Sequence, residues 1–142
     1  MDQWKKHGLI LGFLTLLNVV NFMDRSVSLV IDEAIRKDLN LSDAQLGLLQ
    51  GLAFALIYCV VAIPLSRLAD RGHHRSVIGW SVLIWSAMTA MGAFAQSFAQ
   101  LATTRIGVAA GEAGLTPASH SLLSRLFKSE QRGLAIAIFT LG

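Results

Sequence analysis

The chain has 142 residues, of which 54% are hydrophobic and 15% charged, and its mean hydropathy is +0.56. This balance is too apolar for a soluble domain of this length and indicates an integral membrane protein. The net charge of +3 is small and no basic run carries interleaved aromatic residues, so nucleic acid is excluded as an expected partner. The single cysteine, Cys59, excludes a disulfide within the chain, and the sequence lacks metal-ligand spacing, so we expect no metal site and no cofactor.

The first apolar segment follows a short polar head that contains Lys5 and Lys6. Apolar residues continue without a charge up to Asp24 and Arg25 and resume beyond them. We interpret residues 8–31 as one span of about 24 residues, which is long enough to cross a membrane and carries a buried charged pair. A cleaved signal peptide is disfavoured, because its apolar region would be shorter and no small-residue cleavage site precedes Asp24.

Further apolar stretches divide the rest of the chain. A polar loop is expected at 32–43, where Ser42 and Gln45 have the spacing of a capping box. Spans are predicted at 43–66, 76–95 and 101–123, and an apolar run at 133–142 is too short to cross. The expected fold is therefore all-α, with four full transmembrane helices and the start of a fifth. A helix that stops inside lipid leaves polar backbone groups unpaired, so we interpret 1–142 as a fragment, with a self-contained four-helix protein as the alternative.

Basic residues alternate between the two sides of this arrangement. Eight of the Lys and Arg residues fall in the head and in the polar loops at 67–75 and 124–132. Only Arg36 and Lys37 fall in the loops of the opposite side. The positive-inside rule then places the N-terminus in the cytoplasm of a multi-pass protein, for which we expect the cell membrane.

The charged residues inside the spans are the candidates for function. Arg105 and Glu112 lie seven residues apart, on one face of the fourth span and about 10 Å apart along its axis. From the helical rise, Asp24 and Arg105 fall at about the same level near the outer side, so we predict that they pair. Glu112 falls near the midplane with no cation on its own turn, which makes it a candidate for proton coupling.

Polar residues nearby have plainer explanations. Asn18, Asn21 and Arg25 share a face of the first span, where the two amides either join helices or line a pore. His120 is expected near the membrane boundary rather than in a catalytic role. An enzyme is disfavoured, because the spans offer no nucleophile and base at helical spacing.

Three motifs resemble those of the major facilitator superfamily. The loop SRLADRGHHR is similar to that family's cytoplasmic signature G-x-L-A-D-R-x-G-R-R/K, between the second and third helices. It matches at Leu68, Ala69, Asp70, Arg71 and Arg75 and departs from the signature at Ser66, His73 and His74.

The two other motifs are Asn21-x-x-Asp24-Arg25 and Gly111-Glu112-Ala113, and with them the chain resembles the spinster-like branch. The anion:cation symporter branch shares the Asp-Arg and Gly-Glu-Ala pieces. That branch usually continues with proline and aromatic residues, whereas here Gly114-Leu115-Thr116-Pro117 follows.

The resemblance implies a twelve-helix secondary transporter built from two six-helix halves, of which 1–142 would be most of the first. It implies alternating access, a proton-coupled lipid-like or small organic substrate, contact with membrane lipids, and a C-terminal half as the partner. The resemblance implies that Asp24 and Glu112 take part in proton coupling. It implies that Arg25, Arg105 and Asn21 pair with these charges or contact the substrate. It also implies that Asp70, Arg71 and Arg75 form the cytoplasmic gate. Two alternatives remain: a symporter for sugar acids or other carboxylates, and a non-transporting four-helix membrane scaffold.

Overall fold

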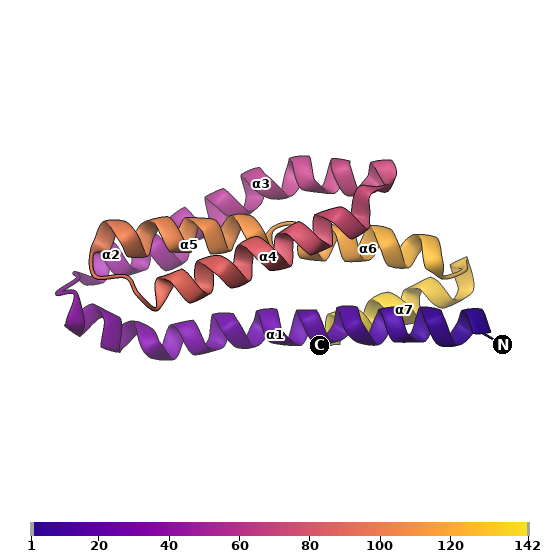
Figure 1. Ribbon diagram of the computed structural model, residues 1–142, viewed down its shortest axis with the longest axis horizontal. Coiled ribbons are helices and arrows are strands. Elements are labelled where there is room, and N and C mark those ends of the chain that lie inside the picture. The colour runs from indigo at the N-terminus through magenta and orange to yellow at the C-terminus, as the bar shows by residue number, and fades with distance from the viewer. Residues whose placement is uncertain (1, 142) are drawn as a thin grey trace.

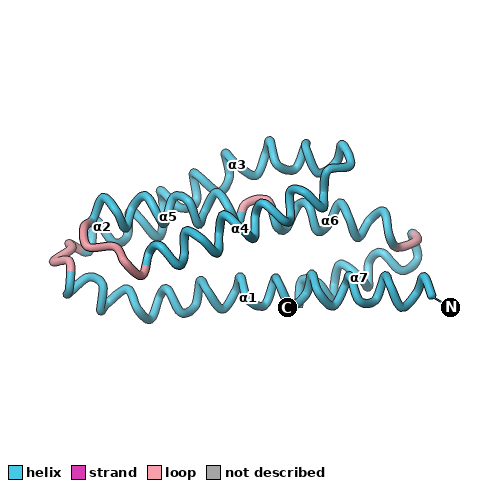
Figure 2. Tube along the Cα trace, viewed as in Figure 1, coloured by secondary structure: helices cyan, strands magenta, loops and turns pink. Residues whose placement is uncertain are grey.

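The computed structural model describes residues 2–141, without the side chains of residues 2–5, 29 and 31–33. Met1 and Gly142, which end the expected domain, lie outside the described residues. The described residues form helices joined by short turns and contain no strand (Figure 2). This confirms the expected all-α class.

The helices form five rods in the described residues. In chain order the elements are α1 (Asp2–Asp38), α2 (Asp43–Gly47), the π-helical η1 (Leu48–Ala53), α3 (Phe54–Leu68), the π-helical η2 (Ala69–His73), α4 (His74–Gly92), α5 (Phe98–Glu112), α6 (Leu115–Leu126) and α7 (Ser129–Leu141). The elements from α2 to α3 follow one another as one rod, and α5 with α6 form another. In Figure 1, α1 runs the length of the molecule with α7 beside its first half, and α4, α5 and α6 lie between α1 and α3.

The first helix is longer than expected, since a polar loop was predicted from residue 32 and the helix continues to Asp38. Good helix formers such as Ala34, Arg36 and Lys37 explain the extension. The predicted capping box is confirmed: the Ser42 hydroxyl accepts a hydrogen bond from the Gln45 backbone N–H, and the Gln45 side chain accepts one from the Ser42 N–H.

The expected single helix at 101–123 is also wrong, because α5 ends at Glu112 and α6 begins at Leu115. Pro117 supplies the physical reason: it has no N–H to donate to the carbonyl of Ala113, four residues earlier, and its ring crowds that position. The helix resumes where the Ala118 N–H donates to the Gly114 carbonyl at 3.2 Å. The break sets Glu112 at the end of a helix instead of inside one.

Small residues bring α4 and α5 close together. A Cβ added at Gly111 would lie 2.6 Å from the backbone nitrogen of Trp85, so only glycine fits without moving α4. A Cβ at Gly107 would meet the Met88 side chain, and one at Gly114 would meet Ser81. These glycines share a face of the rod, and the close approach is the packing that small residues allow between membrane helices.

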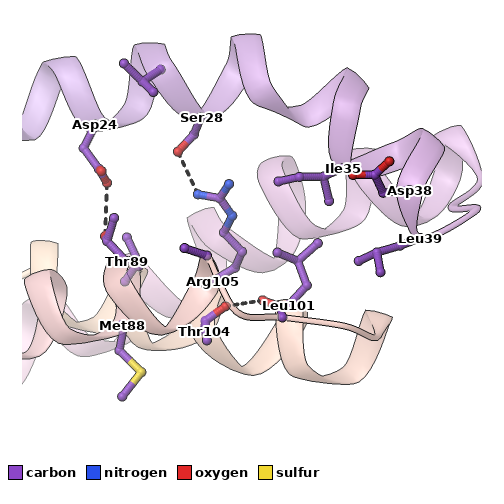
Figure 3. Close-up of a pocket in the computed structure, with 15 residues that line it drawn as sticks. Asp24, Ser28, Ile35, Asp38, Leu39, Met88, Thr89, Leu101, Thr104 and Arg105 are labelled. Carbon is purple, nitrogen blue, oxygen red and sulfur yellow. Dashed lines mark hydrogen bonds between the residues drawn. The ribbon is translucent and has the colours of Figure 1, made fainter.

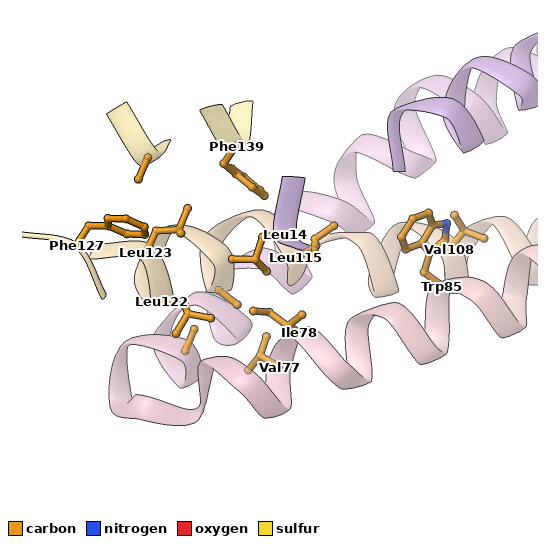
Figure 4. Close-up of a cluster of buried hydrophobic side chains, with 13 residues drawn as sticks. Leu14, Val77, Ile78, Trp85, Val108, Leu115, Leu122, Leu123, Phe127 and Phe139 are labelled. Atoms are coloured by element: carbon orange, nitrogen blue, oxygen red, sulfur yellow. The ribbon is translucent and has the colours of Figure 1, made fainter. Parts of the chain in front are cut away.

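Buried apolar side chains hold the remaining rods together. Leu14 of α1, Leu115 and Leu123 of α6 and Phe139 of α7 are each at most 2% exposed and meet in one cluster (Figure 4). Many other large apolar side chains stay on the surface. Two helical stretches, Lys6–Ser28 and Asp43–Gly92, are long and apolar enough to cross a membrane.

Most of the basic residues lie at one end of the bundle. Figure 1 places the N-terminus, the junction of α3 with α4 and the turn between α6 and α7 toward the same end, opposite the α1–α2 and α4–α5 connections. We call it the basic end, because it carries Lys6, Arg71, Arg75, Arg125, Lys128 and Arg132. The alternation seen in the sequence is therefore a property of the folded chain.

We expect Gly111→Ala to lower the thermal stability of the purified protein, because the added methyl group forces α4 away from α5. Overpacking of this kind costs about 1–3 kcal/mol. Gly79→Ala in α4 is the matched control, since nothing lies within 4 Å of its Cβ position. Thermal unfolding in detergent measures both, and equal melting temperatures for the two variants would contradict the close approach.

Candidate functional site

Glu112 is the most deeply buried charged side chain of the described residues, with a side-chain exposure of 0%. Its Oε2 atom accepts a hydrogen bond from Nε of Arg25 at 2.7 Å and lies 2.5 Å from Nη2 of the same guanidinium. Removing a carboxylate from water costs several kcal/mol, and a cation in direct contact offsets part of that cost. The pair joins the end of α5 to the middle of α1.

The structure corrects one expectation about the charges and adds a contact. Glu112 has no cation on its own turn, as expected, but Arg25 reaches it from the neighbouring rod. Asp24 was expected to pair with Arg105, but its Oδ2 accepts from Trp85 Nε1 at 3.1 Å and from the Thr89 hydroxyl at 3.4 Å. Asp24 and Arg25 are adjacent and about 100° apart on α1, so the rotation of α1 selects which of them faces Glu112.

Arg105 lies across from the next turn of α1. Its Nη1 donates to the Ser28 hydroxyl at 2.8 Å. Figure 3 shows Asp24 and Ser28 pointing from α1 toward Thr89 and Arg105. These residues line a cavity of about 370 Å³. Asp24 and Arg105 therefore line the same cavity, although they do not pair.

Aromatic rings support the exposed side of Arg25. The guanidinium carbon lies 5.3 Å from the ring centroid of Phe54 and 5.3 Å from that of Tyr58, both from α3. The two rings stack at 6.4 Å with an angle of 20°. A cation over aromatic faces is stabilised electrostatically. The Arg25 side chain nevertheless remains 45% exposed, so one side of it is open to an incoming anion.

A second cavity, of about 210 Å³, adjoins the ion pair. Its lining includes Asp24, Arg25, Ser28, Gln50, Phe54, Arg105, Val108 and Glu112. Gln50 reaches it from the π-helical segment η1, and such wide turns often occur at functional sites. Asn21 interacts electrostatically with the Glu112 carboxylate, although its Nδ2 meets no acceptor at hydrogen-bonding geometry among the described residues. The cavity thus combines two cations, two carboxylates and an aromatic wall.

Asp70, Arg71 and Arg75 lie away from this cavity, at the basic end, and all three are exposed. The chain reverses at Gly72, whose φ of 102° is a conformation that other residues rarely adopt. Arg125 of α6 donates from Nη2 to the Asp70 backbone carbonyl. The structure therefore separates the candidate residues into a central charged group and a turn at the basic end.

Several residues that contact the charged side chains were not predicted from the sequence, although their positions in the sequence could have indicated them. Trp85 and Thr89 are four residues apart and share a face of α4, and both donate to Asp24. Ser28 and Gln50 are polar residues inside apolar segments. Among the aromatic residues of the apolar segments, Trp85 is buried, Tyr58 lies beside Arg25 and Trp80 is exposed. No three His, Cys, Asp or Glu side chains in the described part of the chain are grouped as metal ligands.

Comparison with known proteins adds to this geometry. A family model described as Major Facilitator Superfamily matches residues 14–142. The chain is 40% identical over 145 aligned residues to an MFS-type efflux pump of Mycolicibacterium smegmatis, covering 99% of the chain and 34% of that protein. It is 32% identical over 121 residues to the probable L-galactonate transporter of Escherichia coli, covering 85% of the chain and 26% of that protein. The chain thus spans about a quarter to a third of the length of these relatives.

A solved structure also matches. It is the crystal structure of a bacterial homolog to the human lysosomal transporter Spinster, in an inward-facing and unoccupied conformation. The TM-score is 0.90 at 41% sequence identity, and the match covers 95% of this chain and 28% of that chain. This similarity confirms both the fold and the spinster-like resemblance expected from the motifs.

We expect Arg25→Ala to destabilise the protein at neutral pH, because it leaves the Glu112 carboxylate buried without its cation. Breaking a fully buried ion pair lowers the free energy of unfolding by about 3–5 kcal/mol. Because Arg25 is partly exposed, we expect a loss near the lower value. Adding Glu112→Gln to Arg25→Ala should recover much of the loss, since no buried charge then remains.

Arg36→Ala is the matched control, because its partner Asp43 is 87% exposed and such surface pairs contribute at most about 1 kcal/mol. Thermal unfolding of the purified variants measures all of these effects. The assignment fails if Arg25→Ala is as mild as Arg36→Ala, or if the double variant recovers nothing.

Proposed function

Because the chain belongs to the major facilitator superfamily, we propose that it forms part of a secondary active transporter that works by alternating access. The observation that carries the proposal is the Arg25–Glu112 pair, buried on its carboxylate side and open on its guanidinium side. A transporter that couples two solutes needs a site whose charge changes and whose surroundings respond to it. The membership also makes this a multi-pass membrane protein, since the family consists of such proteins.

Proton coupling at Glu112 follows from the cost of its burial. When the carboxylate is ionised, the guanidinium of Arg25 must stay beside it to offset the lost hydration. When it is protonated, that constraint weakens and Arg25 is free to take another partner. The bistable element we propose is therefore the Arg25–Glu112 contact, which forms when Glu112 is ionised and separates when it is protonated.

The remaining candidates receive roles from their positions. Asp24, held by Trp85 and Thr89, is a second proton site beside the same cavity. Arg25, with Arg105 and Asn21, contacts the substrate or balances the carboxylates. Asp70, Arg71 and Arg75 act at the gate of the basic end, where Arg125 holds the reversed turn.

The substrate we propose is a lipid-like or small organic molecule with an anionic group. The cationic side chains of Arg25 and Arg105 attract the anion, and the Phe54 and Tyr58 rings receive an apolar part. We place the protein in the cell membrane with its basic end and N-terminus in the cytoplasm, in accordance with the charge asymmetry.

We expect Glu112→Gln to abolish proton-driven flux while leaving counterflow exchange largely intact, because the amide can neither gain nor lose the proton. The measurement uses the complete product of the reading frame in liposomes, with a lysolipid and L-galactonate as test substrates. Glu130→Gln is the control, since Glu130 is exposed on α7. Loss of both activities, or of neither, would count against proton coupling at Glu112.

A symporter for sugar acids or other carboxylates is the second candidate, favoured by two arginines at one cavity and by the similarity to the probable L-galactonate transporter of Escherichia coli. If it is correct, inward pH-dependent uptake of L-galactonate should exceed that of the lysolipid in the same vesicles. Preference for the lysolipid would instead support the lipid-like substrate.

A further inference from the structure

Buried polar atoms without a hydrogen-bond partner are grouped in the described part of the chain. They are Asn21 Nδ2, Gln50 Nε2, His74 Nδ1, Glu112 Oε1, Ser119 Oγ and His120 Nε2. Buried polar atoms are almost always paired with protein or ordered water, so a group of this kind marks places where water binds. Three of these atoms belong to residues at the Glu112 site, and the other three belong to residues nearer the basic end.

Phe139 of α7 lies between the two groups. Asn21 lies beside Glu112, and Asn18 is one turn closer to the basic end on the same face of α1. Asn18 Nδ2 donates to the Phe139 carbonyl of α7 at 3.1 Å. The His120 ring packs edge-on against the buried Phe139 ring, with centroids 5.4 Å apart and an angle of 77°. Asn18 and His120 therefore share Phe139 as a neighbour at the interface of α1, α6 and α7.

His120 also borders a cavity of about 530 Å³ at the basic end. Its lining includes Ser66, Asp70, Pro117, His120, Ser121, Ser124 and Arg125. Hydroxyl groups predominate there, and the lining also includes the charged residues Asp70 and Arg125. Phe139 of α7 and Asn18 of α1 carry no titratable group. His120 is therefore the titratable residue between the buried track and this open, polar cavity.

We propose that water bound along Asn21, Asn18 and Ser119 connects Glu112 to the basic end, and that His120 passes protons between this track and the cavity. The inference rests on the proposed proton coupling at Glu112. A proton that leaves the Glu112 carboxyl group moves to water, then to a nitrogen of the neutral imidazole, and from there to water in the cavity. Glu112 is left as a carboxylate paired with Arg25, and the reverse sequence reloads it.

The test follows the proton itself, so no transported substrate is needed. The complete product of the reading frame is subjected to a rapid pH jump, and infrared spectroscopy records the carboxyl band that disappears in Glu112→Gln. We expect His120→Gln to slow the appearance of this band by about tenfold or more, since positioned proton transfer contributes at least that much in other proteins. Imidazole buffer should restore the rate by replacing the missing side chain.

His7→Gln is the matched control, because His7 also contacts an aromatic ring, that of Phe127 at 5.8 Å, but lies off the track. Ser119→Ala is a second variant, with slower proton transfer and an unchanged melting temperature as the expected result. An unchanged rate in both His120→Gln and Ser119→Ala, or slow transfer in His120→Gln that imidazole does not restore, would overturn the track and leave Glu112 coupling standing. Absence of any band specific to Glu112 would instead overturn the proposed function, and the track with it.

Discussion

The structure depends on how the charge of one buried carboxylate is compensated by a neighbouring cation. Glu112 lies at a helix end with no exposure of its side chain, and the folded chain brings Arg25 within hydrogen-bonding distance of it. Because Arg25 also contacts the rings of Phe54 and Tyr58, a single guanidinium joins α1, α3 and α5. The ion pair at Glu112 therefore also links three rods.

The backbone makes room for this arrangement. Gly111 lets α5 approach α4 so closely that no side chain fits between them, and Pro117 interrupts the helix directly after Glu112. The same approach places Trp85 where its indole N–H reaches Asp24. Two carboxylates thus share one region but have different partners, and carboxyl groups in different surroundings are suited to different roles.

The two ends of the bundle differ in character. Near the end opposite the basic end, Asp24, Ser28, Thr89 and Arg105 surround a cavity between rods (Figure 3). At the basic end, the reversed turn at Gly72 is held by Arg125, and a polar cavity opens beside His120. The central charged group thus lies between a cavity near one end of the bundle and a cavity at the other.

What the sequence alone determined is what short-range physics controls. Apolar runs and their lengths indicate membrane helices, the Ser42–Gln45 spacing specifies a cap, and basic residues alternate between ends. The helical rise also brought Asp24 and Arg105 into the same region, and both line one cavity. Three motifs were sufficient to indicate the family.

The pairing of charges was decided only by the tertiary structure. Asp24 and Arg25 point in directions about 100° apart around α1, so the rotation of that helix about its axis decides which of the two side chains faces Glu112. Rotation is fixed by packing, through Leu14, Phe139 and the glycine face of α5, and none of these contacts is local in sequence. For the same reason the sequence could place His120 only by its height, and its contact with Phe139 of α7 is visible only in the folded chain. Height along a helix can be counted from the sequence, but direction around it depends on neighbouring helices.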